Sequence, residues 1–360
     1  IQIDLGRSLF APAYDFRQHI EDTLGLKIGM DYTTMSQWSS HTEDGQDFGM
    51  SQVLRALGTW RPIRTPGGAR GELVWKTETR TSLGGNPTPR DLGFNSGSAL
   101  STANFKELRY WGLTDLYWKQ LFQDGKYGIL VGHMDPGDWA DQYSLLNAWT
   151  SFMNDAFYNN PTEAIPSRGF GIVGQLYTEK SLYLLAGIHD ANGGDGRLDW
   201  NSFWDGSEYF TWAEVGLRGE SGISARNNTH LHVWHQDARE EAGTEESWGT
   251  IFTHSFVTGH DGVAFLRAGY SEGDAPQMRR FVGAGYSTKV FDRDRLGIAT
   301  SWGSPPDKSR RDQVTSEIFY RLQVTENMTI SPDLQLIYQP SFTDETDWLV
   351  MPGVRVRIEF

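Results

Sequence analysis

The chain of 360 residues ends in the stretch WLVMPGVRVRIEF, residues 348–360, whose side chains alternate in character at every second position. The even positions carry Trp348, Val350, Pro352, Val354, Val356, Ile358 and Phe360. The odd positions near the end carry Arg355, Arg357 and Glu359 instead. Successive side chains of a strand point to opposite faces, so a period of two places one apolar face opposite one hydrated face. The stretch therefore predicts a β-strand between an apolar and a watery environment.

The same alternation continues toward the N-terminus in segments of roughly ten residues. We predict strands at 24–38, 50–62, 70–82, 107–122, 126–135, 169–178, 181–190, 207–217, 229–236, 248–259, 261–270, 279–288, 294–302, 312–323, 328–340 and 347–360. Short connections alternate with long ones between these segments. An even number of such strands, with short turns on one rim and long loops on the other, is typical of a closed barrel. Residues 1–360 are therefore expected to form one all-β domain, a transmembrane antiparallel β-barrel of about sixteen strands.

The composition excludes several other classes of protein. Aromatic residues make up 13% of the chain, which is more than a disordered protein carries. The absence of Cys removes disulfides and thiolate metal sites, and it suits an exported protein. A formal net charge of -14 argues against nucleic acid as a partner, because phosphate binding depends on Lys and Arg. No run of about 18 apolar residues occurs, which excludes a helical membrane protein but not a membrane barrel.

Charged residues lie in the middle of the predicted strands, on the polar face. Arg55, Lys76, Glu78, Arg80 and Lys119 are examples. A charge facing lipid costs about 2–4 kcal/mol at the bilayer midplane, so these side chains are expected to face a water-filled lumen. Trp and Tyr residues cluster near the strand ends, as is typical of the boundary between membrane and water.

Two segments depart from the strand pattern. Residues 8–23 have helical spacing behind Ser8, which is a suitable N-cap, and they predict an amphipathic helix at a barrel mouth. Residues 135–168 form the longest connection, and a loop of this length in a compact fold is usually functional. We expect this loop alone to fold back into the lumen as a constriction.

Short motifs follow one another along the last two thirds of the chain. They are GILVGHMD at 128–135, GIHDAN at 187–192, YRLQVT at 320–325, PDLQ at 332–335 and GVR at 353–355, with Asn147, Phe152, Asn154, Ala156, Phe157, Asn160, Pro161 and Glu317. Over about 126–360 the chain resembles the carbohydrate-selective porin family, the OprB-like porins, whereas residues 1–125 resemble it only loosely. The resemblance implies a barrel in the Gram-negative outer membrane, monomeric or homotrimeric, in contact with lipid and lipopolysaccharide. It implies passive diffusion of small sugars without a chemical step or a cofactor.

A wide barrel needs a constriction in order to select its solute. The predicted substrate-binding residues are Arg55, Lys76, Glu78, Arg80, Arg109 and Lys119 on the strands, and Asp135, Asp138, Trp139, Asp141, Tyr143, Asn147, Trp149, Phe152, Asn154, Asp155 and Phe157 in the loop. Aromatic rings offer flat faces to sugar C–H groups, while Asp and Asn exchange hydrogen bonds with hydroxyls. An acidic loop opposite a basic wall favours polyhydroxylated solutes over apolar ones. In the alternative interpretation, the rings only fix the loop to the wall.

Two other functions stay open. A lumen rich in Arg also suits anions such as sugar acids. A secreted β-rich glycoside hydrolase or lectin would also use aromatic and acidic residues, although no pair of carboxylates stands out by its spacing. His230, His232 and His235 suggest a metal site, but no nearby carboxylate completes a ligand set, so hydrated lumen histidines and no metal are expected.

Overall fold

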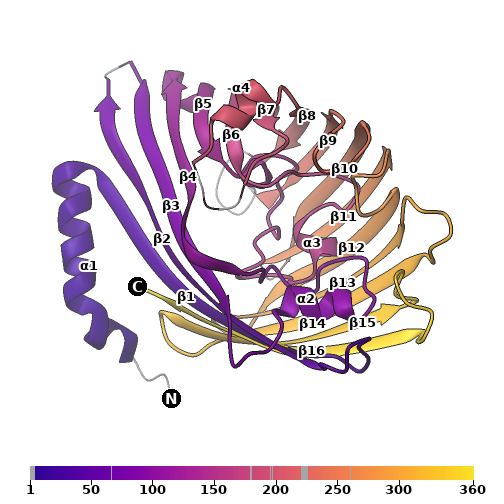
Figure 1. Ribbon diagram of the computed structural model, residues 1–360. Coiled ribbons are helices and arrows are strands. Elements are labelled where there is room, and N and C mark those ends of the chain that lie inside the picture. The colour runs from indigo at the N-terminus through magenta and orange to yellow at the C-terminus, as the bar shows by residue number, and fades with distance from the viewer. Residues whose placement is uncertain are drawn as a thin grey trace.

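The computed structural model describes residues 5–65, 67–178, 181–194, 196, 198–219, 226–259 and 261–360. Sixteen strands close into one antiparallel barrel (Figure 1). Each strand pairs with its neighbours in sequence, and β1 closes the barrel against β16 with Tyr32 opposite Ile358. The predicted fold class is therefore confirmed.

The strands are β1 Leu26–Trp38, β2 Phe48–Arg64, β3 Arg70–Ser82, β4 Leu108–Phe122, β5 Tyr127–Met134, β6 Gly169–Tyr177, β7 Leu182–Asp190, β8 Tyr209–Arg218, β9 Asn228–Gln236, β10 Ser247–Thr258, β11 Gly262–Glu272, β12 Arg280–Val290, β13 Asp294–Ser304, β14 Gln313–Gln323, β15 Met328–Tyr338 and β16 Trp348–Glu359. Every predicted strand is present, and each begins and ends within two residues of its predicted bounds. The period of two was therefore a sufficient signal for the whole wall.

The wall turns its apolar face outward. On β16, Trp348 is 57% exposed and Val350 is 40% exposed, whereas Arg355 on the other face is only 1% exposed. A soluble protein would place these two kinds of side chain the other way round. The charges in the middle of the strands thus lie inside the barrel, as their cost in lipid predicts.

The helices of the described residues are α1 Leu5–Leu24, α2 Pro89–Asn95, α3 Asp155–Tyr158 and α4 Asn201–Asp205, with the 3-10 turns η1 Gln123–Gly125 and η2 Pro136–Asp138. Helix α1 lies outside the ring of strands, beside the C-terminus (Figure 1). The Arg17 guanidinium donates a hydrogen bond to the carbonyl of Phe360 and so ties this helix to the end of the chain. The helix begins at Leu5, so the prediction of Ser8 as its N-cap was wrong. Leu5 and Leu9 continue the apolar spacing of four residues by one more turn. No helix of the described part is both long and apolar enough to cross a membrane.

The two rims of the barrel differ in their connections. At the short-turn rim, three or four residues join β4 to β5, β12 to β13 and β14 to β15. At the long-loop rim, the connections 83–107, 135–168 and 191–208 are much longer. We name the first two the β3–β4 loop and the β5–β6 loop.

Both of these loops fold into the barrel, where α2 and α3 lie (Figure 1). In the β3–β4 loop, the amide of Ala99 donates to the side chain of Gln313 on β14 at 3.0 Å. The side chain of Gln335 on β15 donates to the carbonyl of Thr102 at 2.8 Å. The expectation that the β5–β6 loop alone folds inward was therefore wrong. In the β3–β4 loop, residues 96–105 carry no charged side chain, so this loop enters the barrel with little desolvation cost.

Candidate functional site

Ion pairs fix both ends of the β5–β6 loop to the wall. Asp135 accepts a hydrogen bond from the amide of Gly137 at 3.0 Å and pairs with Arg168, at the other end of the loop, at 3.2 Å. Asp138 pairs with Lys76 of β3 at 3.1 Å. Arg168 also pairs with Glu78 of β3 at 3.1 Å, so both ends of the loop are held against the wall.

The middle of the loop is anchored by a buried network of charges. Asp141 pairs with Arg267 of β11, accepts from the hydroxyl of Thr253 at 2.7 Å, and lies 2.7 Å from Nε2 of His230. Burial opposes the ionisation of Asp141, but the Arg267 guanidinium outweighs it and holds the pKa of this carboxyl below its usual range. Asp141 therefore fixes the loop to β9, β10 and β11, and it is not among the residues that line the cavity described below.

His230 and His232 belong to this anchor, whereas the side chain of His235 is 40% exposed. His232 lies 2.9 Å from Glu163 of the loop and 3.3 Å from Glu214 of β8, and its side chain is fully buried. The expectation of hydrated lumen histidines without nearby carboxylates was wrong, because the loop and β8 bring in acidic residues that are distant in sequence. Among the residues described, no group of His, Asp and Glu has an arrangement that could hold a metal ion.

A cluster of aromatic rings completes the anchor. The ring centroid of Phe152 lies 5.3 Å from that of Phe157, 5.9 Å from Phe265 on β11 and 5.0 Å from Phe319 on β14. Phe152 and Phe157 are both 0% exposed. Asn154, which is also fully buried, caps α3 and donates to Gln335 at 2.8 Å. The prediction that Phe152, Asn154 and Phe157 contact the solute was therefore wrong, and the alternative of rings that fix the loop to the wall holds for the two Phe residues.

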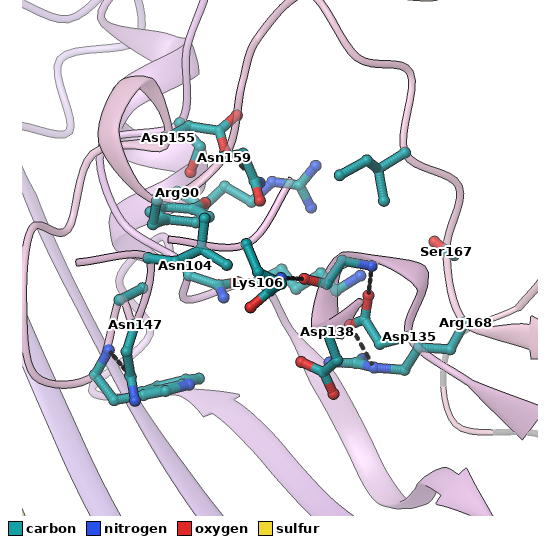
Figure 2. Close-up of a pocket in the computed structure, with 18 of the residues that line it drawn as sticks. Arg90, Asn104, Lys106, Asp135, Asp138, Asn147, Asp155, Asn159, Ser167 and Arg168 are labelled. Atoms are coloured by element: carbon teal, nitrogen blue, oxygen red, sulfur yellow. Dashed lines mark hydrogen bonds and ion pairs between the residues drawn. The ribbon is translucent and has the colours of Figure 1, made fainter. Parts of the chain in front are cut away.

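A cavity of about 560 Å³ lies between the β3–β4 loop, the β5–β6 loop and the early strands. We call it the central cavity. Ten of the predicted residues line it: Arg55, Lys76, Glu78, Arg80, Asp135, Asp138, Tyr143, Asn147, Trp149 and Asp155. Sequence reasoning missed other polar residues of its lining, namely Arg90, Ser101, Asn104, Lys106, Gln142, Ser144, Tyr158, Asn159, Ser167, Arg168 and Gln277. Figure 2 shows Asp135, Asp138 and Arg168 on one side of this cavity and Arg90, Asp155 and Asn159 on another.

The missed residues come mostly from the two inward loops, and one sequence signal marks the β3–β4 loop. Thr88 caps α2 by accepting a hydrogen bond from the amide of Asp91 at 3.1 Å, and Pro89 occupies the first turn. An N-cap residue followed by Pro is a recognisable sequence signal for the start of a helix, and this signal places Arg90 in a helix. The inward course of Asn104 and Lys106 depends on contacts with distant strands and has no local signal.

Trp149 organises two cations at the cavity wall. The guanidinium carbon of Arg55 lies 4.1 Å from the ring centroid of Trp149, and that of Arg80 lies 5.4 Å from it. Phe105 packs edge-on against the same ring at 5.4 Å. A cation over an aromatic face is attracted by the ring quadrupole, so Trp149 supports the two guanidiniums on the cavity wall.

The three remaining predicted residues also lie outside the central cavity. Lys119 is 5.2 Å from the ring of Trp139, which packs edge-on against Tyr117, and neither Lys119 nor Trp139 lines the central cavity. The side chain of Arg109 is 79% exposed and pairs with Glu107. The prediction that Arg109 faces the lumen was wrong because of a β-bulge. Lys76 pairs with Asp115 but Thr77 pairs with Leu113, so the extra residue Thr114 reverses the alternation beyond it.

The central cavity has an uneven balance of charge. Its lining contains six cationic side chains, Arg55, Lys76, Arg80, Arg90, Lys106 and Arg168, and four carboxylates, Glu78, Asp135, Asp138 and Asp155. The Asp138 side chain is 51% exposed, but partial desolvation within the barrel, opposed by Lys76 and assisted by Asp115 and Asp135, raises its pKa to about 6. Burial also raises the pKa of Asp155. Both shifts leave the cavity more positive as the pH falls.

Comparisons of the sequence and of the structure with known proteins both find porins. The sequence profile of the "Carbohydrate-selective porin, OprB family" matches residues 238–360. The structure of Pseudomonas putida OprB at high pH is similar, with a TM-score of 0.73, 15% identity and coverage of 97% of each chain. The low-pH structure of the same protein has a TM-score of 0.59, 13% identity and coverage of 100% of this chain and 99% of that one.

A mutant of the Rh. blastica porin has a TM-score of 0.53 at 13% identity, and the comparison covers 93% of this chain and 100% of that one. No curated protein sequence matches the chain. The chain is therefore a closed sixteen-stranded barrel with the fold of bacterial porins, and its residues 238–360 match the carbohydrate-selective porin, OprB family.

Proposed function

We propose that this protein is an outer-membrane porin that lets small sugars diffuse passively through its lumen, with the central cavity as the selective narrowing. The apolar outer face of the wall fits a lipid bilayer. The match of residues 238–360 to the carbohydrate-selective porin family supports sugar as the class of solute.

The observation that carries the proposal is the lining of the central cavity. Cations and carboxylates face one another there, and Asn104, Asn147, Asn159 and Gln277 add amide groups to the same cavity. A sugar that enters loses hydration, and a wall with both donors and acceptors can replace those hydrogen bonds. An apolar solute cannot gain in this way.

The structure also shapes how a sugar would be bound. The face of Trp149 is already occupied by Arg55 at 4.1 Å, so the ring acts mainly as a support for guanidinium donors. We propose that the hydroxyl groups of the sugar are bound by Arg55, Arg80 and the side-chain amides of the Asn and Gln residues in the lining. Each contact must be weak, because a sugar that binds tightly would block the channel.

Hydrolysis fits the site less well. A glycosidase needs one carboxyl group as an acid and a second as a nucleophile or base. Here Glu78 pairs with Arg80 at 2.9 Å and with Arg168 at 3.1 Å, and Asp138 pairs with Lys76. Asp135 pairs with Arg168 as well, so ion pairs hold three of the four carboxylates of the cavity, and the barrel architecture is that of a channel.

A second candidate function has its own observation. The excess of cations over carboxylates in the central cavity favours anions, which include sugar acids. Swelling of liposomes that contain the purified protein separates the two candidates. For a sugar porin, neutral hexoses enter readily and at rates that differ between isomers. If only a carboxylated sugar enters, the protein is an anion porin, and if neither enters, both candidates are wrong.

A further inference from the structure

A second, smaller cavity lies on the long-loop side of the central cavity. It has a volume of about 280 Å³, and we call it the rim cavity. Its walls come from the β5–β6 loop, the end of β9 and the connections 237–246 and 273–279: Asp155, Asn159, Asn160, Glu163, Ala164, Ile165, Gln236, Arg239, Thr244, Ala275 and Gln277. Asp155, Asn159 and Gln277 also line the central cavity, so the two cavities share a wall.

Four buried polar atoms of the rim cavity have no hydrogen-bond partner among the described residues. They are Nδ2 of Asn160, Oε2 of Glu163, Nε2 of Gln236 and Oγ1 of Thr244. Asn160 and Gln236 are each 1% exposed, and Glu163 is 7% exposed. A buried polar atom without a partner is costly, and native proteins keep few of them. Four around one small cavity indicate a place built for a polar occupant.

The protein itself holds two of these groups in position. Oδ1 of Asn160 accepts from the amide of Thr162 at 3.2 Å and from its hydroxyl at 2.8 Å, and its NH₂ group has no partner in the described part of the chain. Oε1 of Glu163 lies 2.9 Å from His232, whereas Oε2 has no partner among the residues that the structure describes. The side chains of Asn160 and Glu163 are therefore already ordered in the wall of the rim cavity, which reduces the entropic cost of binding.

The chemistry of the rim cavity fits a polyhydroxylated ring. Asn160 and Gln236 offer N–H donors, Glu163 offers an acceptor, and the hydroxyl of Thr244 can be either. Ala164, Ile165 and Ala275 add small apolar surfaces for C–H groups. Its volume is just below the range of about 300–1,000 Å³ of drug-sized sites, so it suits a single sugar unit. Its lining contains two carboxyl groups, Asp155 and Glu163, against one cation, Arg239, and this balance disfavours an anion.

From this geometry we infer that the rim cavity is a second saccharide subsite, which takes one neutral sugar unit at the long-loop rim before it passes to the central cavity. The inference rests on the proposed sugar-porin function, but it adds a separate binding step. It also makes the two entrances of the channel differ, because only a sugar that arrives from the long-loop rim meets the rim cavity before the central cavity.

Single-channel recording can detect this step, because the rate at which a sugar blocks the current can be measured from each side. Since the chain has no Cys, a Gln46→Cys background and an impermeant thiol reagent identify the chamber that the long-loop rim faces. The probe is maltose, added to one chamber at a time. Gln236→Met removes the amide at similar volume, and Thr244→Val removes the hydroxyl as an independent second variant. The matched control is Gln18→Met on the exposed surface of α1 outside the barrel.

The expected result is a fall of about fivefold in the blocking rate from the long-loop side for each variant, which corresponds to one lost hydrogen bond. The rate from the short-turn side, the open-channel current and all rates of Gln18→Met stay unchanged. Unchanged rates from both sides would mean that the rim cavity holds ordered water only, and an equal fall from both sides would mean a general distortion. Either outcome overturns the inference while the proposed function stands. If wild-type protein shows no block by maltose from either side, the proposed function itself fails.

Discussion

The Arg55 guanidinium lies between an acid and an aromatic face: it pairs with Asp31 at 2.9 Å and stands 4.1 Å from the ring centroid of Trp149. Asp31 belongs to β1, Arg55 to β2 and Trp149 to the inward β5–β6 loop. The contact thus joins the barrel wall to the loop at the lining of the central cavity. Four predictions follow from this arrangement and from the anchors of the loop.

Trp149→Ala is expected to weaken sugar binding. Without the ring, Arg55 and Arg80 lose a contact worth about 0.5–2 kcal/mol each and sample more orientations. We expect the dissociation constant for glucose, measured from current noise, to rise about tenfold, and the open-channel current to increase. Trp348→Ala on the outer face removes the same side chain away from the cavity, and it should change neither quantity. An unchanged dissociation constant in Trp149→Ala would show that the ring does not support the donors.

Charge selectivity tests which cations face the solute. Arg90→Gln combined with Lys106→Gln removes two of the six cations in the lining of the central cavity. The reversal potential across a salt gradient should therefore shift toward cation selectivity. Arg109→Gln serves as the control, because the β-bulge at Thr114 turns Arg109 outward. A shift of similar size in Arg109→Gln would contradict the outward placement.

Selectivity should also depend on pH. The pKa of Asp138 is raised to about 6, so Asp138 is neutral below pH 6 and gains a negative charge above it. Anion preference should accordingly decrease as the pH rises from 5 to 7. Asp138→Asn keeps this residue neutral at every pH. Most of the decrease in anion preference between pH 5 and pH 7 should therefore disappear, and the preference measured at pH 5 should be retained. If Asp138→Asn titrates like the wild type, another group controls the charge of the cavity.

The buried anchor of the β5–β6 loop should dominate its stability. Asp141→Asn leaves the fully buried Arg267 without its ionic partner, and breaking a buried pair costs about 3–5 kcal/mol. We expect urea unfolding in detergent micelles to show a loss of this size. Glu246→Gln also breaks a pair, with His235, but this carboxylate is 69% exposed, so the change should stay below about 1 kcal/mol. Equal losses of unfolding free energy in Asp141→Asn and Glu246→Gln would contradict the stabilising role of the loop anchor.

The sequence predicts the wall well and the interior only in part. The period of two depends on local contact with lipid or water, so every strand of the barrel was readable from neighbouring residues. The alternation failed at Arg109, where a single bulge residue, Thr114, reverses it. No local pattern predicts such a bulge.

Inside the barrel, the residue type alone does not separate binding from anchoring. Asp138 and Asp141 are three residues apart in one loop, yet Asp138 lines the central cavity, whereas Asp141 is buried against Arg267. Phe152 and Trp149 differ in the same way. These roles depend on which distant strand lies opposite each side chain, and only the folded chain supplies that information.

The most direct test of the central claim is single-channel conductance of the purified protein in a planar lipid bilayer, titrated with glucose and maltose. The account predicts discrete open steps whose current is reduced by a sugar in a saturable way, with weak affinity in the millimolar range or above, as a conducting channel requires. Open steps that no sugar reduces, together with strong anion selectivity, would contradict a sugar-selective cavity and leave an anion porin of the same fold.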